Sequence, residues 1–224
     1  MADFRIAWAT FARDLRLELR TRESLNAMLF YALLVVVIFS FAFESEAELT
    51  ARVGGGLLWV AFLFAGLVAL DRAFVRELPG DTLTGLLLSP APRAALMAGK
   101  FASSFILMLA IETVLLPLFA VLFNVSPAVH WSGIVLTVVL GTWALAVTGT
   151  YFSAMSIHTR HRALLLPLLL LPVVIPAVIS MVQATQVFLG RSGVADYWWK
   201  LLFGFDVVFT TLGLLLADIV LDVD

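Results

Sequence analysis

Six long apolar runs constrain the fold of this chain more than any other feature. They lie at Leu25 to Phe43, Leu57 to Leu70, Phe101 to Phe123, Trp131 to Ala154, Ala163 to Val182 and Trp199 to Val220. A helix needs about 20 apolar residues to cross a hydrocarbon core about 30 Å thick, and every run except the second comes close to that length. Hydrophobic residues make up 62% of the chain and charged residues 13%, which excludes a water-soluble globular domain. The sequence therefore predicts an all-α integral membrane bundle of six transmembrane helices, in one domain over residues 1–224.

The segment before the first run, residues 1–26, has the pattern of an amphipathic helix. Its apolar side chains share one helical face, and three arginines lie roughly opposite. These two sets are Phe4, Trp8, Phe11, Leu15 and Leu19, and Arg13, Arg16 and Arg20. A basic amphipathic helix of this kind binds the surface of an anionic leaflet. We therefore expect an interfacial helix over residues 1–26.

Lys and Arg residues are distributed unevenly between the two sides of the predicted bundle. If the amino terminus is cytoplasmic, only Arg52, Arg191 and Lys200 lie outside, and all the other Lys and Arg residues lie in the cytoplasm. Positively charged loops are retained on the cytoplasmic side of a membrane. The sequence therefore predicts a multi-pass protein with both termini in the cytoplasm.

Composition and motifs exclude several classes of function. The formal net charge is -2 and no basic patch is interleaved with aromatic residues, so nucleic acid is not an expected partner. The absence of cysteine excludes disulfides and thiolate metal sites. Gly99-Lys100 is the fragment nearest to a phosphate-binding loop, but Phe101 follows it where Ser or Thr is needed, so the chain does not bind ATP by a P-loop.

Enzymatic and metal-binding groupings are also missing from the sequence. It has no Ser-His-Asp set, no pair of carboxylates at one site and no H-E-x-x-H motif. We therefore expect no enzyme activity, no catalytic residue and no metal ligand in this chain. The three histidines fit no haem-ligand motif and are expected to be solvated loop residues: His130, His158 and His161.

The longest polar stretch after the amino-terminal segment spans residues 71–100, on the cytoplasmic side of the predicted topology. It turns at Pro79-Gly80 and can then form a short amphipathic helix that ends near Ser89. Its leucines share one face of that helix: Leu83, Leu86 and Leu87. Such a helix is suited to a groove on a soluble partner, whereas a solvated connector is the alternative interpretation, and spacing does not decide between them.

Two carboxyl groups lie at membrane depth, Glu112 in the third run and Asp206 in the sixth. A carboxylate at that depth costs several kcal/mol unless it is paired, neutral or wetted. Each is a candidate either for a hydrogen bond that locks helices together or for a role in a substrate or coupling pathway. The sequence leaves both interpretations open.

Small residues and prolines mark three of the spans. Small residues recur at every fourth position in the second span (Ala61, Ala65, Ala69, Ala73) and in the fourth (Thr142, Ala146, Thr150, Ala154). Such stripes let helix backbones approach closely, either within one chain or at a homodimer seam. The fifth run contains Pro167, Pro172 and Pro176, which predict a bent or broken helix.

Three of these features together resemble the CcmB family, the membrane permeases of the cytochrome c maturation ABC transporter. They are the amphipathic amino-terminal helix, the loop FVRELPGDTLTGLLLSP (Phe74 to Pro90) and the run LLLPLLLLPVVIP (Leu164 to Pro176). The resemblance covers nearly the whole chain. The family loop typically has F-x-x-D-x-x-D-G-S-L-E; here Glu77 replaces the first Asp, Gly80-Asp81 reverses the Asp-Gly pair, and Thr84 replaces the final acid.

The resemblance implies a non-catalytic permease subunit in the bacterial inner membrane that is required for haem export or handling in c-type cytochrome biogenesis. ATP hydrolysis is expected on a separate CcmA-like subunit, and CcmC, CcmD, the haem chaperone CcmE and a second copy of this chain are expected as further partners. No firmly bound cofactor is expected, and haem is a transported or handled ligand. The segment 71–100 is then a cytoplasmic coupling loop, whose expected ATPase-coupling residues are Phe74, Arg76, Glu77, Asp81, Thr82, Leu83, Leu86 and Leu87.

Three other functions fit the same membrane bundle. One is an ABC permease that exports a lipid, a polysaccharide or a drug. Another is an ion-coupled secondary transporter with Glu112 and Asp206 as coupling groups, although no inverted repeat is visible between the two halves of the sequence. The last is an assembly scaffold without transport.

Overall fold

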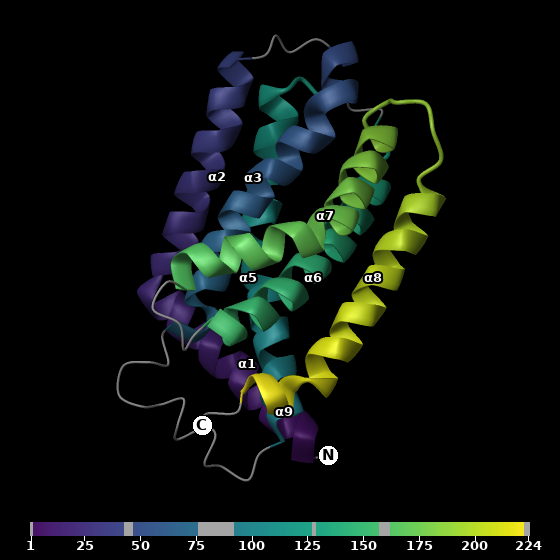
Figure 1. The fold of residues 1–224 in the computed structure, drawn as a ribbon. Helices are drawn as coiled ribbons and strands as arrows, with labels where there is room; N and C mark the ends of the chain where they lie inside the picture. Colours follow the sequence, from purple (N-terminus) through teal and green to yellow (C-terminus); the bar gives the residue numbers. More distant parts are fainter. Residues whose placement is uncertain (1, 43–46, 76–91, 127–128, 157–161, 222–224) are drawn as a thin grey trace.

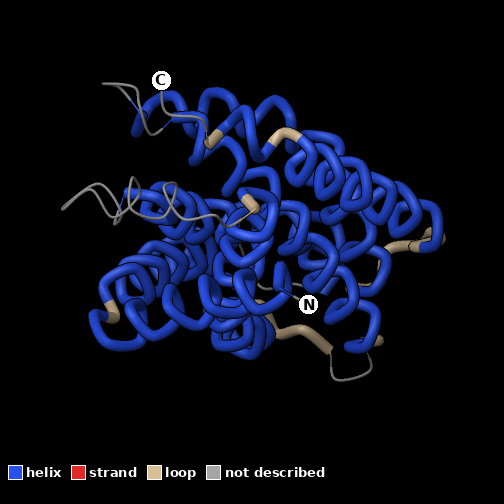
Figure 2. Tube along the Cα trace, turned by 90° about the horizontal axis from the view of Figure 1, so that it is seen from below, coloured by secondary structure: helices blue, strands red, loops and turns tan. Residues whose placement is uncertain are grey.

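The computed structural model describes residues 2–42, 47–75, 92–126, 129–156 and 162–221, and every regular element in these ranges is a helix (Figures 1 and 2). The helices are α1 (Ala2–Thr21), α2 (Glu23–Ala42), α3 (Ala47–Val75), α5 (Arg93–Leu122), α6 (Trp131–Ser156), α7 (Arg162–Phe188), α8 (Asp196–Leu215) and α9 (Ala217–Val220). Within the described residues, six helices, α2, α3, α5, α6, α7 and α8, are long and apolar enough to cross a membrane. The predicted all-α bundle of six membrane helices is confirmed.

Several boundaries differ from those predicted. The amino-terminal helix ends at Thr21 instead of residue 26, because Arg22 adopts a positive φ of 55° that a helix cannot accommodate. The second span is longer than the run Leu57 to Leu70, since α3 extends from Ala47 to Val75. Residues 93–100, assigned to the coupling loop, are helical and belong to α5, and residues 71–75 extend α3 beyond its apolar run. The sixth span ends at Leu215, and α9 follows it as a separate short helix.

Helices α3 and α6 are the most buried of the six spans, with 56% and 72% of their apolar windows buried. Their stripes of small residues are buried within the chain: Ala61, Ala65 and Ala69 on α3, and Thr142, Ala146, Thr150 and Ala154 on α6. Gly149 lies so close to α3 that a Cβ atom there would be 2.2 Å from a methyl group of Leu70. The stripes therefore serve packing within the chain, and the homodimer seam considered for them is wrong.

Helix α7 contains all three prolines of the fifth run and is bent without being broken. The helix is continuous from Arg162 to Phe188. Figure 1 shows its first half crossing the bundle and its second half running along it. A proline lacks the N–H that the preceding turn needs and its ring clashes there, which accounts for the bend.

Both ends of the described chain lie at the same end of the bundle, where Figure 1 shows α1 and α9 near each other. Both helices pack against α5. This arrangement agrees with an even number of spans. Which side of the membrane that end faces stays a prediction from the Lys and Arg distribution.

Candidate functional site at the junction of α1, α3 and α5

A cavity of about 170 Å³ lies where α1, α2, α3 and α5 meet. The junction adjoins the end of α3 and the start of α5, the two helices that residues 76–91 connect. Five charged side chains line the cavity: Arg13, Asp14, Glu18, Arg72 and Lys100. Charges gathered at the stem of a connection between two spans make this junction the candidate functional site.

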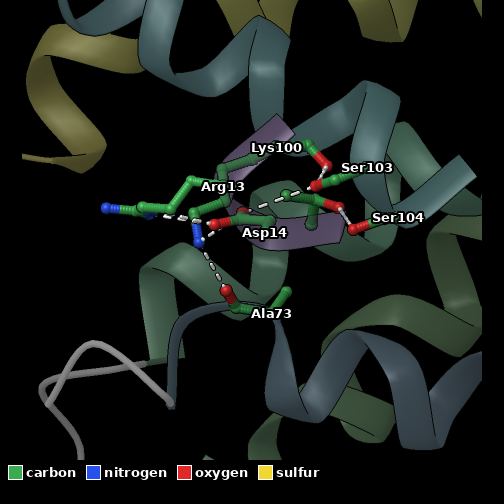
Figure 3. A network of polar contacts seen from close by, with 7 residues as sticks. Arg13, Asp14, Ala73, Lys100, Ser103 and Ser104 are labelled. Carbon is green, nitrogen blue, oxygen red and sulfur yellow. Dashed lines mark hydrogen bonds and ion pairs between the residues drawn. The ribbon is translucent and has the colours of Figure 1, made fainter. Parts of the chain in front are cut away.

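Lys100 joins three helices through one ammonium group. Its Nζ lies 3.0 Å from Asp14 Oδ2 on α1 and donates a 2.8 Å hydrogen bond to the carbonyl oxygen of Ala73 on α3 (Figure 3). The side chain of Lys100 is only 6% exposed. Because the last four carbonyls of a helix have no partner within it, the ammonium supplies a donor that α3 lacks and a favourable charge at its carboxyl end.

Asp14 is the acceptor at the centre of the same network. Arg13 Nη2 lies 3.0 Å from its Oδ1, and Ser103 Oγ lies 3.5 Å from its Oδ2, the latter a weak contact (Figure 3). Next to Ser103, Ser104 accepts a 3.0 Å hydrogen bond from Thr150 on α6. The polar contacts thus extend from the interfacial helix to the buried centre of the bundle.

A glycine on α5 permits this contact. A Cβ atom at Gly99 would lie 2.5 Å from the carbonyl oxygen of Ala7 and 2.8 Å from Cβ of Thr10. Helix α1 therefore packs directly on α5 through the face that contains Ala7 and Thr10. This face is neither the apolar face nor the basic face predicted from the sequence. The aromatic face points away from the bundle, with Phe4 74% and Trp8 60% exposed, as an interfacial helix requires.

Two further contacts fix α2 against this junction. The carboxylate of Glu18 accepts a 2.9 Å hydrogen bond from the backbone N–H of Leu25, in the first turn of α2, where N–H groups have no partner within the helix. Arg72 Nη1 lies 2.5 Å from Glu23 Oε1 and so ties α3 to the start of α2. The end of α3 is therefore held from both sides.

Phe74 is the one expected coupling residue that the structure describes, and it is buried. Its ring is 3% exposed, packs with Met97 and Phe101 in a separate apolar cluster, and has Lys100 Nζ 4.9 Å from its centroid. Phe74 therefore anchors the end of α3 and presents no surface to a partner. The remaining expected coupling residues lie outside the described residues: Arg76, Glu77, Asp81, Thr82, Leu83, Leu86 and Leu87.

The far end of the connection is also tied to the bundle. Arg93, the first residue of α5, donates a 2.7 Å hydrogen bond from Nη1 to the carbonyl oxygen of Asp218 in α9. A residue near each end of segment 76–91 is thus fixed, Phe74 through α5 and Arg93 through α9. A force on residues 76–91 would reach these contacts first.

The two carboxyl groups at membrane depth have different surroundings. Glu112 is buried and accepts a hydrogen bond from the hydroxyl group of Thr142, which links α5 to α6. One carboxyl oxygen of Glu112 thus links two helices, whereas its Oε1 has no hydrogen-bond partner among the described residues. Asp206 on α8 is also buried, but neither of its oxygens has a hydrogen-bond partner in the part of the chain that the structure describes.

Sequence analysis missed Asp14 and Lys100 as a pair. The sequence pattern places Lys100 among the cytoplasmic loop charges and indicates no role for Asp14 on the first helix. The sequence does contain a sign of this contact. Thr10, Asp14 and Glu18 are spaced four residues apart, so they share a polar face of the first helix that differs from its apolar and basic faces. Among the described residues no group of three His, Asp or Glu side chains is placed to hold a metal ion, and His130 is exposed.

Comparison with known proteins decides the family. A family model described as CcmB protein matches residues 5–221. The chain belongs to the CcmB family. It is similar to heme exporter protein B of Rhodobacter capsulatus, with 35% identity over 188 residues and 84% of each chain covered.

Other members of the family are similar over comparable lengths. Heme exporter protein B of Paracoccus denitrificans is 31% identical over 210 residues, covering 92% of this chain and 93% of the relative. That of Pseudomonas aeruginosa is 32% identical over 186 residues, covering 81% and 82%. The resemblance to the CcmB family predicted from the sequence is confirmed.

Proposed function

We propose that this chain is the membrane permease subunit of an ABC transporter that exports or handles haem in c-type cytochrome biogenesis. The observation that carries the proposal is the match of the CcmB family model to residues 5–221, together with relatives named heme exporter protein B. Haem is then a transported or handled ligand. The chain itself is not an enzyme, and its lack of a P-loop is consistent with ATP hydrolysis on a separate CcmA-like subunit.

The coupling step assigned to this chain begins at the connection between α3 and α5. In this proposal Arg76, Glu77, Asp81, Thr82, Leu83, Leu86 and Leu87 contact the ATPase subunit. Phe74 and Arg93 hold the two ends of the segment in the bundle. Lys100 bonds to both Ala73 and Asp14, so a movement of the end of α3 is passed to α1 as well as to α5.

The other parts of the proposal concern placement and partners. The protein lies in the bacterial inner membrane with both termini and residues 76–91 in the cytoplasm, where ATP is available. It functions with CcmC, CcmD and the haem chaperone CcmE, and as a pair of identical chains within the complex. Glu112 locks α5 to α6 in this proposal and lies on no haem path.

The test of coupling replaces Leu83 and Leu86 with Asp in cells that depend on this chain for c-type cytochromes. We expect loss of co-purification with the ATPase subunit and of haem-stained c-type cytochromes, because two carboxylates cannot enter an apolar groove. The matched control is Thr84→Asp with Ser89→Asp, two acids on other faces of the same predicted helix. Retention of both readouts in the leucine variant, or equal loss in the control, would refute the docking assignment.

A labelling experiment tests the topology separately. The chain contains no cysteine, so Thr84→Cys introduces a single thiol. An impermeant thiol reagent added to intact cells should leave it unmodified and should modify it after the membrane is opened. Modification in intact cells would place the segment outside, away from ATP, and the coupling proposal would fail.

A further inference from the structure

A groove of about 390 Å³ runs along α8 where it packs against α5 and α6. Its walls are aromatic and aliphatic, with Phe105 and Trp143 on one side and Phe203 and Val207 on the other. Asp206 borders the groove at membrane depth. A lone carboxyl group against such walls is the least expected side chain in this part of the bundle.

The donors around the groove do not serve Asp206. The indole N–H of Trp143 donates to Thr210 Oγ1 at 3.0 Å, and the hydroxyl of Thr211 donates to the carbonyl oxygen of Val207 at 2.7 Å. Neither carboxyl oxygen of Asp206 has a partner in the described ranges, although the residue is 5% exposed. The described part of the chain thus buries the carboxyl group of Asp206 without supplying a hydrogen-bond donor. This burial costs free energy, and a partner molecule that supplies a donor can offset that cost.

The outer face of α8 differs from that of a helix that meets only lipid. Helices α2 and α8 are the least buried spans, each with 17% of its apolar window buried. On α2 the exposed face consists of large side chains such as Phe30, Ile38 and Phe41. On α8 large side chains such as Phe203 and Val208 are exposed too, but the face also includes Gly204, where a Cβ atom would have no neighbour within 4 Å, and such a notch allows another helix backbone to approach.

We propose that this groove binds a transmembrane helix of a partner membrane protein, which brings a basic side chain to Asp206. A lipid tail has no donor at that depth, so it leaves the carboxyl group unpaired. A second copy of this chain is less suited. Away from the span ends, the described outer faces carry no Lys or Arg. Their hydroxyl groups are neutral donors: Tyr31 is exposed on α2, and the hydroxyls of Thr113 and Thr211 already bond within their own helices. The inference requires the membrane bundle and does not rest on the proposed function.

The test is site-specific photocrosslinking in native membranes. A photoreactive phenylalanine analogue replaces Val208 on α8, which is 52% exposed, and in a matched control it replaces Ile38 on α2, which is 55% exposed. We expect the α8 probe alone to capture a different membrane protein. Mass spectrometry should place the crosslink in an apolar segment with a Lys, Arg or His within one helical turn of the linked residue.

Substitution of Asp206 decides whether the carboxyl group causes the capture. Asp206→Leu should lower the crosslink yield at least about tenfold, since a hydrogen bond to a charged group is lost, and Asp206→Asn should lower it less. The thermal stability of the purified Leu variant should be unchanged or higher, because the chain gives Asp206 no partner to lose. Asp206→Lys combined with Asp at the partner's basic position should restore capture.

Several outcomes would overturn the proposal. An adduct with the mass of two copies would make the groove a self-interface, and an adduct with lipid alone would make it a lipid-facing surface. Equal capture from Ile38 would remove the claim for α8. Unchanged capture in Asp206→Leu, or a captured segment with no donor near the linked residue, would show that the carboxyl group does not select the partner.

Discussion

Replacing Lys100 with methionine removes the ammonium group from the junction of α1, α3 and α5 while keeping most of the side-chain volume. The carbonyl oxygen of Ala73 then loses its donor, and Asp14 loses its most buried partner. Breaking a buried ion pair costs about 3–5 kcal/mol. Asp14 keeps Arg13 at 3.0 Å, and its side chain is 15% exposed, so we expect a loss of about 2–3 kcal/mol in the free energy of unfolding.

The measurement is reversible unfolding of the purified chain in mixed micelles, with hydrogen exchange of the α1 amides as a local readout. Lys100→Met should unfold at lower denaturant and exchange α1 faster. Lys200→Met is the matched control, because Lys200 is an exposed lysine on α8 and its loss should change stability by less than about 0.5 kcal/mol.

The double variant Asp14→Asn with Lys100→Met isolates the pair. It removes both charges of the pair, so neither is left without its partner, and it should be more stable than the sum of the two single changes predicts, by about 1–3 kcal/mol. Additive effects, or a Lys100→Met variant as stable as the parent, would show that the three-helix contact does not hold the junction together.

Five further substitutions test other parts of the structure by the same unfolding assay. Gly99→Ala should destabilise the chain by about 1–3 kcal/mol, because the added Cβ meets the backbone of α1. Gly204→Ala should be neutral or stabilising, because the added Cβ there lies in open space. A larger loss of stability in Gly204→Ala than in Gly99→Ala would contradict the packing. Thr142→Val should lower the free energy of unfolding by about 1–3 kcal/mol, because it leaves Glu112 without its donor. Glu112→Gln should cost less and should keep c-type cytochrome levels normal. Loss of those cytochromes in Glu112→Gln would instead favour a role for Glu112 in a substrate or coupling pathway. Arg22→Gly should stabilise by up to about 1 kcal/mol, because its φ of 55° suits glycine, and a lower stability would show that the Arg22 side chain matters more than its backbone.

The sequence was sufficient for the membrane spans and insufficient for the contacts between them. Only helices and closed barrels satisfy their backbone hydrogen bonds in lipid, and barrel strands alternate apolar with polar residues, so long continuous apolar runs predict helices; all six were predicted. The helix end at Thr21 depends on one backbone angle at Arg22, which no apolar pattern encodes. Lys100 seemed to be a loop charge because its partners, Asp14 and Ala73, come from two distant segments. Phe74 was placed in the loop for the same reason, although it packs inside the bundle.

The ionisable groups near or within the membrane can be sorted by whether the chain supplies their partners. Lys100 finds Asp14 and a carbonyl group, and Glu112 finds Thr142, each on another helix. A polar group whose partner lies in the same chain stabilises that chain's fold, so its loss should appear first as instability. Asp206 has no such partner among the described residues, so its loss should leave the isolated chain intact and weaken only an assembly that includes it. Two measurements on Lys100→Met, Thr142→Val and Asp206→Leu therefore separate folding contacts from assembly contacts: the stability of the purified chain and the recovery of the complex. A destabilised Asp206→Leu chain would contradict this distinction.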